Sequence, residues 1–278
     1  MAGRRLARAA LALIPAIVLP SGCGDADHAG PATTTTAAEA RPTATIQLAD
    51  GKITVPAELP GGLVDLHLVA AAGQQPHHLA FLKLAQGVTF AQVEAASDDT
   101  GMFTFAGGNG QLAPGDEMTL TLDLEPGDYG VVDIPFGDEA ASAPTTVVAA
   151  TGTPAVPDAD ATVTLGPSLG IGVPKDIAAG GTWHFANDPT STEPHEAVLL
   201  RLADGKTTKD VVAWAQSFAG PPPADFVGGF GAVGPGHQGW IQDAAALPAG
   251  SYAFACFLPG ADGVPHVAAG MITGFTVP

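Results

Sequence analysis

Hydrophobic and β-branched residues gather in short segments along most of the chain, and Gly- and Pro-rich turns separate the later ones. Segments of this kind are Thr43–Leu48 and Ala161–Leu165. Many short strands with such turns are typical of a β-sandwich or a β-barrel. The pattern therefore predicts an all-β fold.

The chain also matches itself at a spacing of about 120 residues. Residues Pro76–Val93 align without a gap on Pro194–Val211, with eight of 18 positions identical and an offset of 118. A self-match at a fixed offset indicates a repeat, so we expect two copies of one domain, at 43–152 and 158–278. The intervening linker is short and carries prolines, which predicts a fixed relation between the copies.

Each copy contains one predicted helix. Thr89 and Gln92 in the first copy, and Thr207 and Asp210 in the second, have the spacing of a capping box ahead of a half-apolar stretch. The expected architecture is thus a β-sandwich with one inserted helix in each copy. At 110 to 120 residues, each copy is large enough to bury its own core.

The N-terminus predicts export. Arg4, Arg5 and Arg8 precede an uncharged apolar run at 9–19, which is typical of a signal peptide at 1–22. The run is about half of the roughly 20 residues that a spanning helix needs, and no later segment is long and apolar enough to replace it. The mature chain is therefore not expected to span a membrane.

The signal ends in Leu-Pro-Ser-Gly before Cys23, which resembles the bacterial lipobox, although Pro20 departs from it. This resemblance implies that Cys23 is lipidated and holds the protein at the outer face of the cell membrane. Residues 23–42 have almost no large apolar side chains and are expected to form a flexible tether. The alternative is ordinary cleavage, which frees Cys23 or removes it.

The net charge of the mature chain narrows the classes of partner that it can bind. Without the signal, seven Lys and Arg residues stand against 28 Asp and Glu residues, a formal net charge of −21. Nucleic acid and anionic lipid head groups are poor partners for such a chain. A basic protein partner fits it, although a solvated acidic surface is the simpler reading. No small-molecule substrate is indicated.

Cysteine usage points to the candidate chemistry. Only Cys23 and Cys256 occur, so lipidation of Cys23 leaves Cys256 as a lone thiol in an exported protein. Such a thiol needs burial or a metal ion to protect it. His266 and Met271 follow on the same loop, and His195 begins an earlier predicted strand.

The order His, Cys, His, Met resembles the cupredoxins, the blue-copper family, and the loop is most similar to that of the copper nitrite reductases. The loop here is one residue longer, and Glu196 stands where the family usually has Asn. The resemblance implies two tandem Greek-key β-sandwiches and one type 1 copper. It assigns Cys256, His195 and His266 as equatorial ligands and Met271 as the axial ligand. A thiolate, two imidazoles and a weak thioether suit copper that cycles between Cu(I) and Cu(II).

The resemblance also implies a strand arrangement. The strands that carry Cys256 and Met271 should be neighbours, and the strand that starts at His195 should reach the same end. In the first copy, His77 aligns with His195 but Asp133 aligns with Cys256, so that copy is expected to lack the site. The alternative is that these residues have only a structural role, as a core cysteine, a core methionine and hydrogen-bonded histidines.

A carrier fits the sequence better than an enzyme. The chain has no His-x-His, which multicopper oxidases need, and Ala255 stands where nitrite reductases carry a histidine. The first hypothesis is therefore single-electron transfer at the cell surface. The alternatives are a metal-free cupredoxin-like binding or scaffold module of the envelope, and a copper binding or delivery protein.

Overall fold

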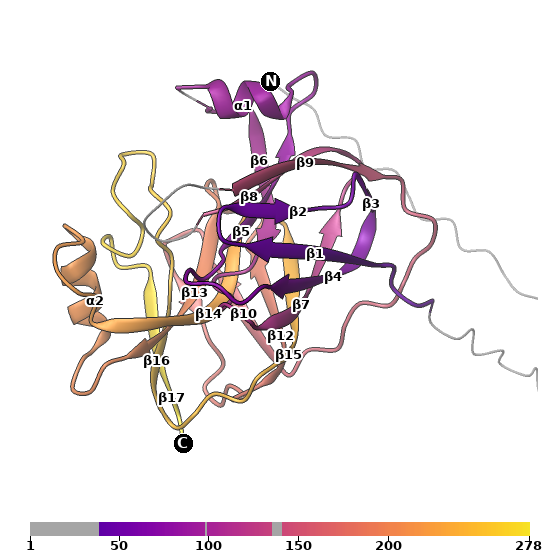
Figure 1. The fold of residues 1–278 in the computed structure, drawn as a ribbon. Coiled ribbons are helices and arrows are strands. Elements are labelled where there is room, and N and C mark those ends of the chain that lie inside the picture. The colour runs from indigo at the N-terminus through magenta and orange to yellow at the C-terminus, as the bar shows by residue number, and fades with distance from the viewer. Residues whose placement is uncertain (1–38, 98, 135–140) are drawn as a thin grey trace, which may run out of the picture. The chain divides into compact units, whose positions relative to one another are not determined.

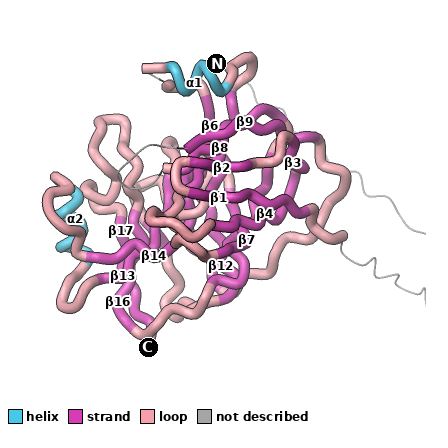
Figure 2. The backbone as a smooth tube through the Cα atoms, in the orientation of Figure 1, coloured by secondary structure: helices cyan, strands magenta, loops and turns pink. Residues whose placement is uncertain are grey.

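The computed structural model describes residues 39–97, 99–134 and 141–278. Residues 38–278 form one compact unit, and its described part is built almost entirely of β-strands (Figures 1 and 2). The predicted signal peptide and Cys23 lie outside the described residues. Within the described ranges, no helix combines the length and the apolar character needed to cross a bilayer.

The first half of the described chain supplies nine strands and one helix. They are β1 (Thr43–Ala49), β2 (Lys52–Thr54), β3 (Glu58–Pro60), β4 (Gly62–Ala70), β5 (Leu79–Leu84), α1 (Phe90–Ala95), β6 (Phe103–Gly108), β7 (Glu117–Leu124), β8 (Gly127–Asp133) and β9 (Ala141–Val148).

The second half supplies eight strands and one helix among its described residues. They are β10 (Ala161–Leu165), β11 (Ile171–Gly172), β12 (Gly181–Asn187), β13 (His195–Leu202), α2 (Thr208–Ala215), β14 (Ala224–Val233), β15 (Gln238–Ala244), β16 (Gly250–Ala255) and β17 (Ile272–Val277).

The strands form two sheets, and both halves contribute to each. One sheet has the order β11-β10-β12-β15-β7-β4-β1-β2, and the other has the order β17-β16-β13-β14-β6-β5-β8-β9-β3. The halves meet where β15 pairs with β7 and where β14 pairs with β6. Outward from the first junction, the strands follow the same order on both sides, β7-β4-β1-β2 and β15-β12-β10-β11.

The sheets continue from one half into the other, a feature that the sequence did not predict. Antiparallel pairing of β15 with β7, such as Ile241 with Leu120, gives each strand a partner that its own half does not provide. An unpaired strand edge leaves backbone donors and acceptors without partners, and the junction covers these edges. That the halves arose by duplication stays a prediction from the sequence.

The core lies between the two sheets. Phe185 of one sheet stacks on Phe230 of the other, with ring centroids 5.0 Å apart, and Phe254 packs edge-on against Phe185. All three side chains have no measurable exposure. Large aromatic residues contribute much of the buried apolar area in such a core, so the strand ends that carry polar residues are held on a rigid frame.

Both predicted helices are confirmed. The Gln92 carboxamide oxygen accepts a hydrogen bond from the backbone N–H of Thr89 at 2.8 Å, ahead of α1. Asp210 accepts from the backbone N–H of Thr207 at 2.9 Å, ahead of α2. These contacts satisfy N–H groups that the helices cannot bond internally. The strands predicted at Thr43–Leu48 and Ala161–Leu165 are present as β1 and β10.

Candidate metal centre

Three strand ends meet at one end of the second half. Antiparallel pairing of β13 with β16 places the start of β13, at His195, beside the end of β16, which directly precedes Cys256. β17 begins just after Met271 and pairs with β16, with Ala255 opposite Ile272. The strand arrangement predicted from the sequence is therefore confirmed.

The loop between β16 and β17 folds back on itself. The backbone N–H of His266 donates to the carbonyl of Leu258 at 2.9 Å, and the N–H of Val267 donates to the carbonyl of Cys256 at 2.7 Å. The N–H of Met271 donates to the carbonyl of His266 at 2.8 Å. These bonds hold His266 over the strand ends.

His195, Cys256 and His266 form a buried group of potential metal donors. Their donor atoms all lie within 4.8 Å of one another. His195 Nδ1 is 3.2 Å from His266 Nδ1, and Cys256 Sγ is 3.4 Å from the same His266 nitrogen. Cys256 has no exposure and each histidine is 2% exposed. Among the described residues, this is the one group of three or more His, Cys, Asp or Glu side chains with that convergence.

These separations fit one small ion. An ion bonded to nitrogen at about 2.0 Å and to sulfur at about 2.3 Å, with angles between tetrahedral and trigonal, spaces two nitrogens about 3.3–3.5 Å apart and a nitrogen and the sulfur about 3.5–3.7 Å apart. The measured distances of 3.2 Å and 3.4 Å are each about 0.1 Å shorter, so a small shift of the side chains admits the ion. Two imidazoles with one thiolate are the equatorial ligands of type 1 copper, so the donor set suits one copper ion of that type.

Burial sets the protonation of the donors. Burial, and after it the neighbouring His266, lower the pKa of His195 to about 4, so this imidazole is neutral near pH 7 and can act as a ligand. Burial raises the pKa of the Cys256 thiol, and Glu196 adds to the rise. The metal-free thiol is therefore protonated, and binding of a metal ion must displace its proton.

Met271 lies next to this group. It has no exposure and belongs to the same apolar cluster as Cys256. Its backbone carbonyl accepts from the N–H of Cys256 at 3.2 Å. The sequence assigned Met271 the axial position, and its place beside Cys256 is compatible with that role.

Glu196 joins the strand end to the loop. Its backbone N–H is 3.5 Å from Cys256 Sγ, and its side-chain Oε1 accepts from the N–H of Phe257 at 2.8 Å. The departure from Asn noted in the sequence therefore still provides a side-chain link between the two ligand-bearing segments. Burial raises the pKa of Glu196 to about 7.

Two contacts around the site were not predicted from the sequence. Glu193 Oε2 lies 3.1 Å from His266 Nε2, and His78 Nε2, from the first half, lies 3.6 Å from Glu196 Oε2. The first contact places a carboxylate on the outer nitrogen of a ligand candidate, and the second connects the halves. The only sequence signal for Glu193 is its position two residues before His195.

At the corresponding end of the first half, a histidine is hydrogen-bonded to a carboxylate. His77 Nδ1 lies 2.5 Å from Asp133 Oδ2, and the backbone N–H of His78 donates to Asp133 Oδ1 at 2.9 Å. His77 and Asp133 are each 2% exposed. Among the described residues, Asp133 thus occupies the place at this end that Cys256 occupies in the second half.

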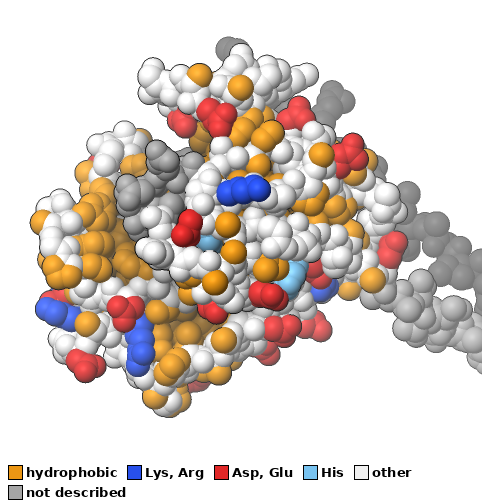
Figure 3. All heavy atoms as spheres, in the orientation of Figure 1, with side chains coloured by type: hydrophobic (Ala, Val, Ile, Leu, Met, Phe, Trp, Pro, Cys, Tyr) orange, Lys and Arg blue, Asp and Glu red, His pale blue; other side chains and the backbone are white. Residues whose placement is uncertain are grey.

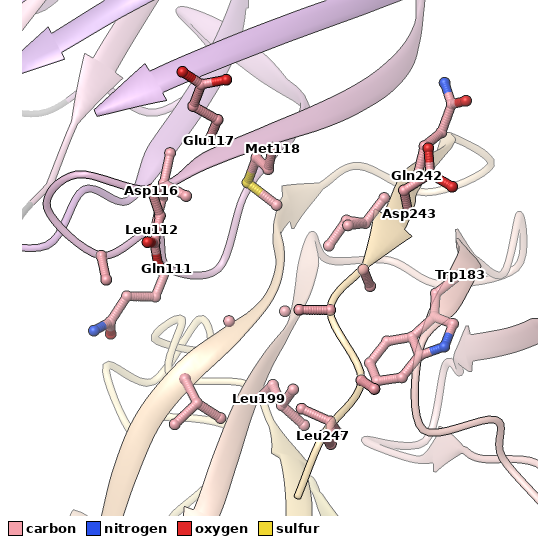
Figure 4. A pocket seen from close by; sticks show the side chains of 18 of the residues that line it. Gln111, Leu112, Asp116, Glu117, Met118, Trp183, Leu199, Gln242, Asp243 and Leu247 are labelled. Carbon is pink, nitrogen blue, oxygen red and sulfur yellow. The ribbon is translucent and has the colours of Figure 1, made fainter. Parts of the chain in front are cut away.

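A separate cavity of about 500 Å³ lies where the halves meet. Side chains from both halves line it, among them Met118, Trp183 and Leu199, as Figure 4 shows. None of the four predicted ligands is among its lining residues. The cavity is therefore distinct from the candidate metal centre.

Hydrophobic side chains gather on the surface beside α2 (Figure 3). Trp214 of α2 packs against Phe218 at 5.0 Å and against Phe257 at 6.4 Å between ring centroids, and Phe226 packs on Phe257 at 5.4 Å. Phe257 directly follows Cys256. The candidate site thus has an apolar surround on this side.

Together these features define an all-β protein with one buried His–Cys–His donor group. Among solved structures it is similar to auracyanin B, with 23% identity over 42% of this chain and 86% of that chain, at a TM-score of 0.29. Auracyanin A from Chloroflexus aurantiacus has 14% identity over 38% of this chain and 99% of that chain, at a TM-score of 0.25.

A copper nitrite reductase from Nitrosomonas europaea has 12% identity over 85% of this chain and 93% of that chain, at a TM-score of 0.22. No family model matches the chain, and no curated protein matches it. These likenesses are too remote to carry a function, which has to be argued from the site.

Proposed function

We propose that the chain is a single-electron carrier with one type 1 copper centre. The observation that carries the proposal is the buried donor group of His195, Cys256 and His266, whose donor atoms are spaced for one small ion. A copper ion bound there supplies one-electron chemistry with little rearrangement of its ligands.

The residues of this chain would each have a distinct part. His195 is neutral near pH 7, and Cys256 gives up its proton when the metal ion binds. Met271 is the proposed weak axial ligand. The surrounding core excludes water from the donors, all of which are at most 2% exposed, and a buried apolar surround favours the less charged Cu(I) state.

A carrier is proposed in preference to an enzyme. The sequence has no His-x-His for a trinuclear cluster, and Ala255 precedes the proposed copper cysteine. The donor group is buried, and the cavity between the halves is lined by other residues. A basic redox protein is the partner that the formal charge of the mature chain favours.

The test is a titration of the full chain with Cu(II), followed by visible absorption. One equivalent should give an intense thiolate-to-copper charge-transfer band, and Cys256→Ser should abolish it. Cys23 remains in that variant, so it controls for binding at the other cysteine. A pale spectrum typical of surface imidazole binding would contradict the proposal and favour a metal-free binding or scaffold module of the envelope.

We further propose that lipid on Cys23 anchors the carrier at the outer face of the cell membrane. The support is the sequence alone, a signal peptide that ends in a lipobox-like segment. The mature protein should then fractionate with membranes and carry the mass of the lipid. If Cys23→Ala leaves both the fractionation and the mass unchanged, the anchor is wrong.

A further inference from the structure

The outer nitrogen of His266 is occupied by a carboxylate. His266 Nε2 lies 3.1 Å from Glu193 Oε2, while its other nitrogen, Nδ1, faces Cys256 Sγ and His195 Nδ1. His266 is 2% exposed, whereas 32% of the Glu193 side chain is exposed. Glu193 therefore stands between His266 and the solvent.

The second oxygen of Glu193 holds the loop that carries His266. Glu193 Oε1 accepts a hydrogen bond from the backbone N–H of Ala261 at 3.0 Å. One carboxylate thus bridges the segment before β13 and the loop between β16 and β17. Both of its oxygens are used, and each has a partner on that loop.

The backbone that carries Glu193 is itself fixed. Asn187, which ends β12 and is 2% exposed, donates from Nδ2 to the carbonyl of Glu193 at 3.2 Å. Pro194 follows directly, and a residue before proline is restricted to extended backbone conformations. The carboxylate is therefore presented to His266 from a constrained segment.

This contact selects one tautomer of His266. A carboxylate only accepts hydrogen bonds, so Nε2 carries the hydrogen and Nδ1 keeps its lone pair toward the donor group. A carboxylate on the outer N–H of a ligating histidine also makes the imidazole a stronger donor and fixes its ring. Its negative charge favours the more positive state of a bound ion.

We propose that Glu193 is a positioning residue of the metal site, which orients His266 for ligation through Nδ1 and lowers the reduction potential of the bound copper. The proposal rests on the proposed function for its effect on copper, but its effect on the tautomer concerns the metal-free chain. In the first half, Gln75 stands before Pro76 and His77, where the second half has Glu193. Glu193→Gln therefore introduces a residue that the chain itself uses at the matching sequence position.

The experiment compares the full-length protein with Glu193→Gln and with Asp188→Asn. Asp188 lies on the same connection between β12 and β13, and its carboxylate bonds to Thr190 and not to His266. Asp188→Asn removes the same charge but leaves the His266 contact, so it is the matched control.

Three measurements report on the site: the tautomer of His266, the affinity for copper and the reduction potential. Nitrogen-15 spectra of the metal-free protein should show His266 protonated at Nε2 in the wild type and in Asp188→Asn, and a mixture of tautomers in Glu193→Gln. The affinity for copper should fall about tenfold or more in Glu193→Gln, and the reduction potential should become more positive than in the control. A purely structural role would not move the potential beyond the shift in Asp188→Asn.

The proposal is overturned if Glu193→Gln keeps the wild-type tautomer, or if its copper affinity and potential equal those of Asp188→Asn. Failure of the proposed function looks different, because the wild type itself would then give no thiolate-to-copper band. In that case an unchanged tautomer spectrum also removes the positioning role, whereas a changed spectrum keeps it for the metal-free chain and removes only the effect on the potential.

Discussion

The two halves of the molecule carry different side chains at matching strand ends. In the first half, Asp133 accepts from the His77 imidazole and from the backbone N–H of His78. In the second half, Cys256 receives the N–H of Glu196 and lies in one donor group with His195. The histidine and the residue after it thus surround a carboxylate in one case and a sulfur in the other.

The residue at the position of Asp133 and Cys256 decides which contacts form at this end. The Asp133 carboxylate hydrogen-bonds the His77 imidazole and the N–H of His78, so both of its oxygens have a partner at this end, although His77 Nε2 is buried without one. A buried thiol satisfies little of its surroundings by hydrogen bonds, and a second imidazole, His266, is brought to it from the following loop. That end thus offers a group of donors to the metal ion that we propose it binds.

The largest expected effect separates the two histidines. His195→Gln should abolish the thiolate-to-copper band, because it removes an equatorial ligand. The matched change His77→Gln should leave the band intact. It should lower the free energy of unfolding by about 1–3 kcal/mol, because Asp133 loses a buried partner. Copper titration and urea unfolding measure the two effects. Equal loss of the band in both variants would break the comparison.

Removing the Asp133 carboxylate tests the end of the first half. Asp133→Ala should lower the free energy of unfolding by about 3 kcal/mol, because His77 and the N–H of His78 both lose their acceptor in the core. The copper stoichiometry of the folded protein should stay at one. The check is urea unfolding with a copper titration of the native variant. A stability equal to that of the wild type would mean that the pair contributes nothing.

Met271→Leu tests the axial position. The variant should keep the intense band, since the equatorial ligands remain, and its reduction potential should rise because a weak axial donor is lost. Voltammetry of the copper-loaded protein measures the change. An unchanged potential would place the Met271 sulfur outside the coordination sphere and make it a core residue only.

The last expected effect is a pH dependence, and it concerns the contact between the two ends. Burial lowers the pKa of His78 to about 4, against 6.5 in the unfolded chain. Below pH 6.5 the unfolded state therefore binds a proton that the folded state does not bind. For this reason the free energy of unfolding decreases as the pH falls from 6.5 toward 4. His78→Gln should remove up to about 1.4 kcal/mol per pH unit of that slope.

Glu196, which faces His78, acts in the opposite direction. Its pKa is raised to about 7, so the folded state binds a proton below that pH, and the contribution to stability grows as the pH falls. This contribution is present in both proteins, so the difference between their slopes reports His78. Urea unfolding of the metal-free proteins between pH 4.5 and pH 7 gives the slopes. Coincident slopes would mean that the pKa of His78 is the same in the folded and unfolded states.

The features that could be predicted from the sequence are those that a short stretch of residues determines. Thr89 and Thr207 open helices because their capping partners lie three residues away, and the turns delimit the strands. The order of His195, Cys256, His266 and Met271 indicates strand ends that the structure places together. Each of these signals lies within a short stretch or follows from a family resemblance.

The remaining features depend on contacts between distant segments. Glu193 lies 68 positions before Ala261 and 73 before His266, and a glutamate on an acidic chain has no local pattern that identifies such a partner. Glu196 was noted only as a departure from Asn, although its longer side chain still reaches the N–H of Phe257. The shared sheets were missed because strand pairing between the halves leaves no periodic signal in either segment.

The junction of the sheets has a consequence for folding. β15 pairs with β7 through contacts such as Gly239 with Leu122, so the search for these partners must close loops of more than one hundred residues, which slows folding. In a half produced alone, β15 would keep β12 and β7 would keep β4, but the edge that the junction covers would be open and would invite pairing with another copy. Hence the intact chain is expected to unfold as one cooperative unit, and an isolated half to self-associate.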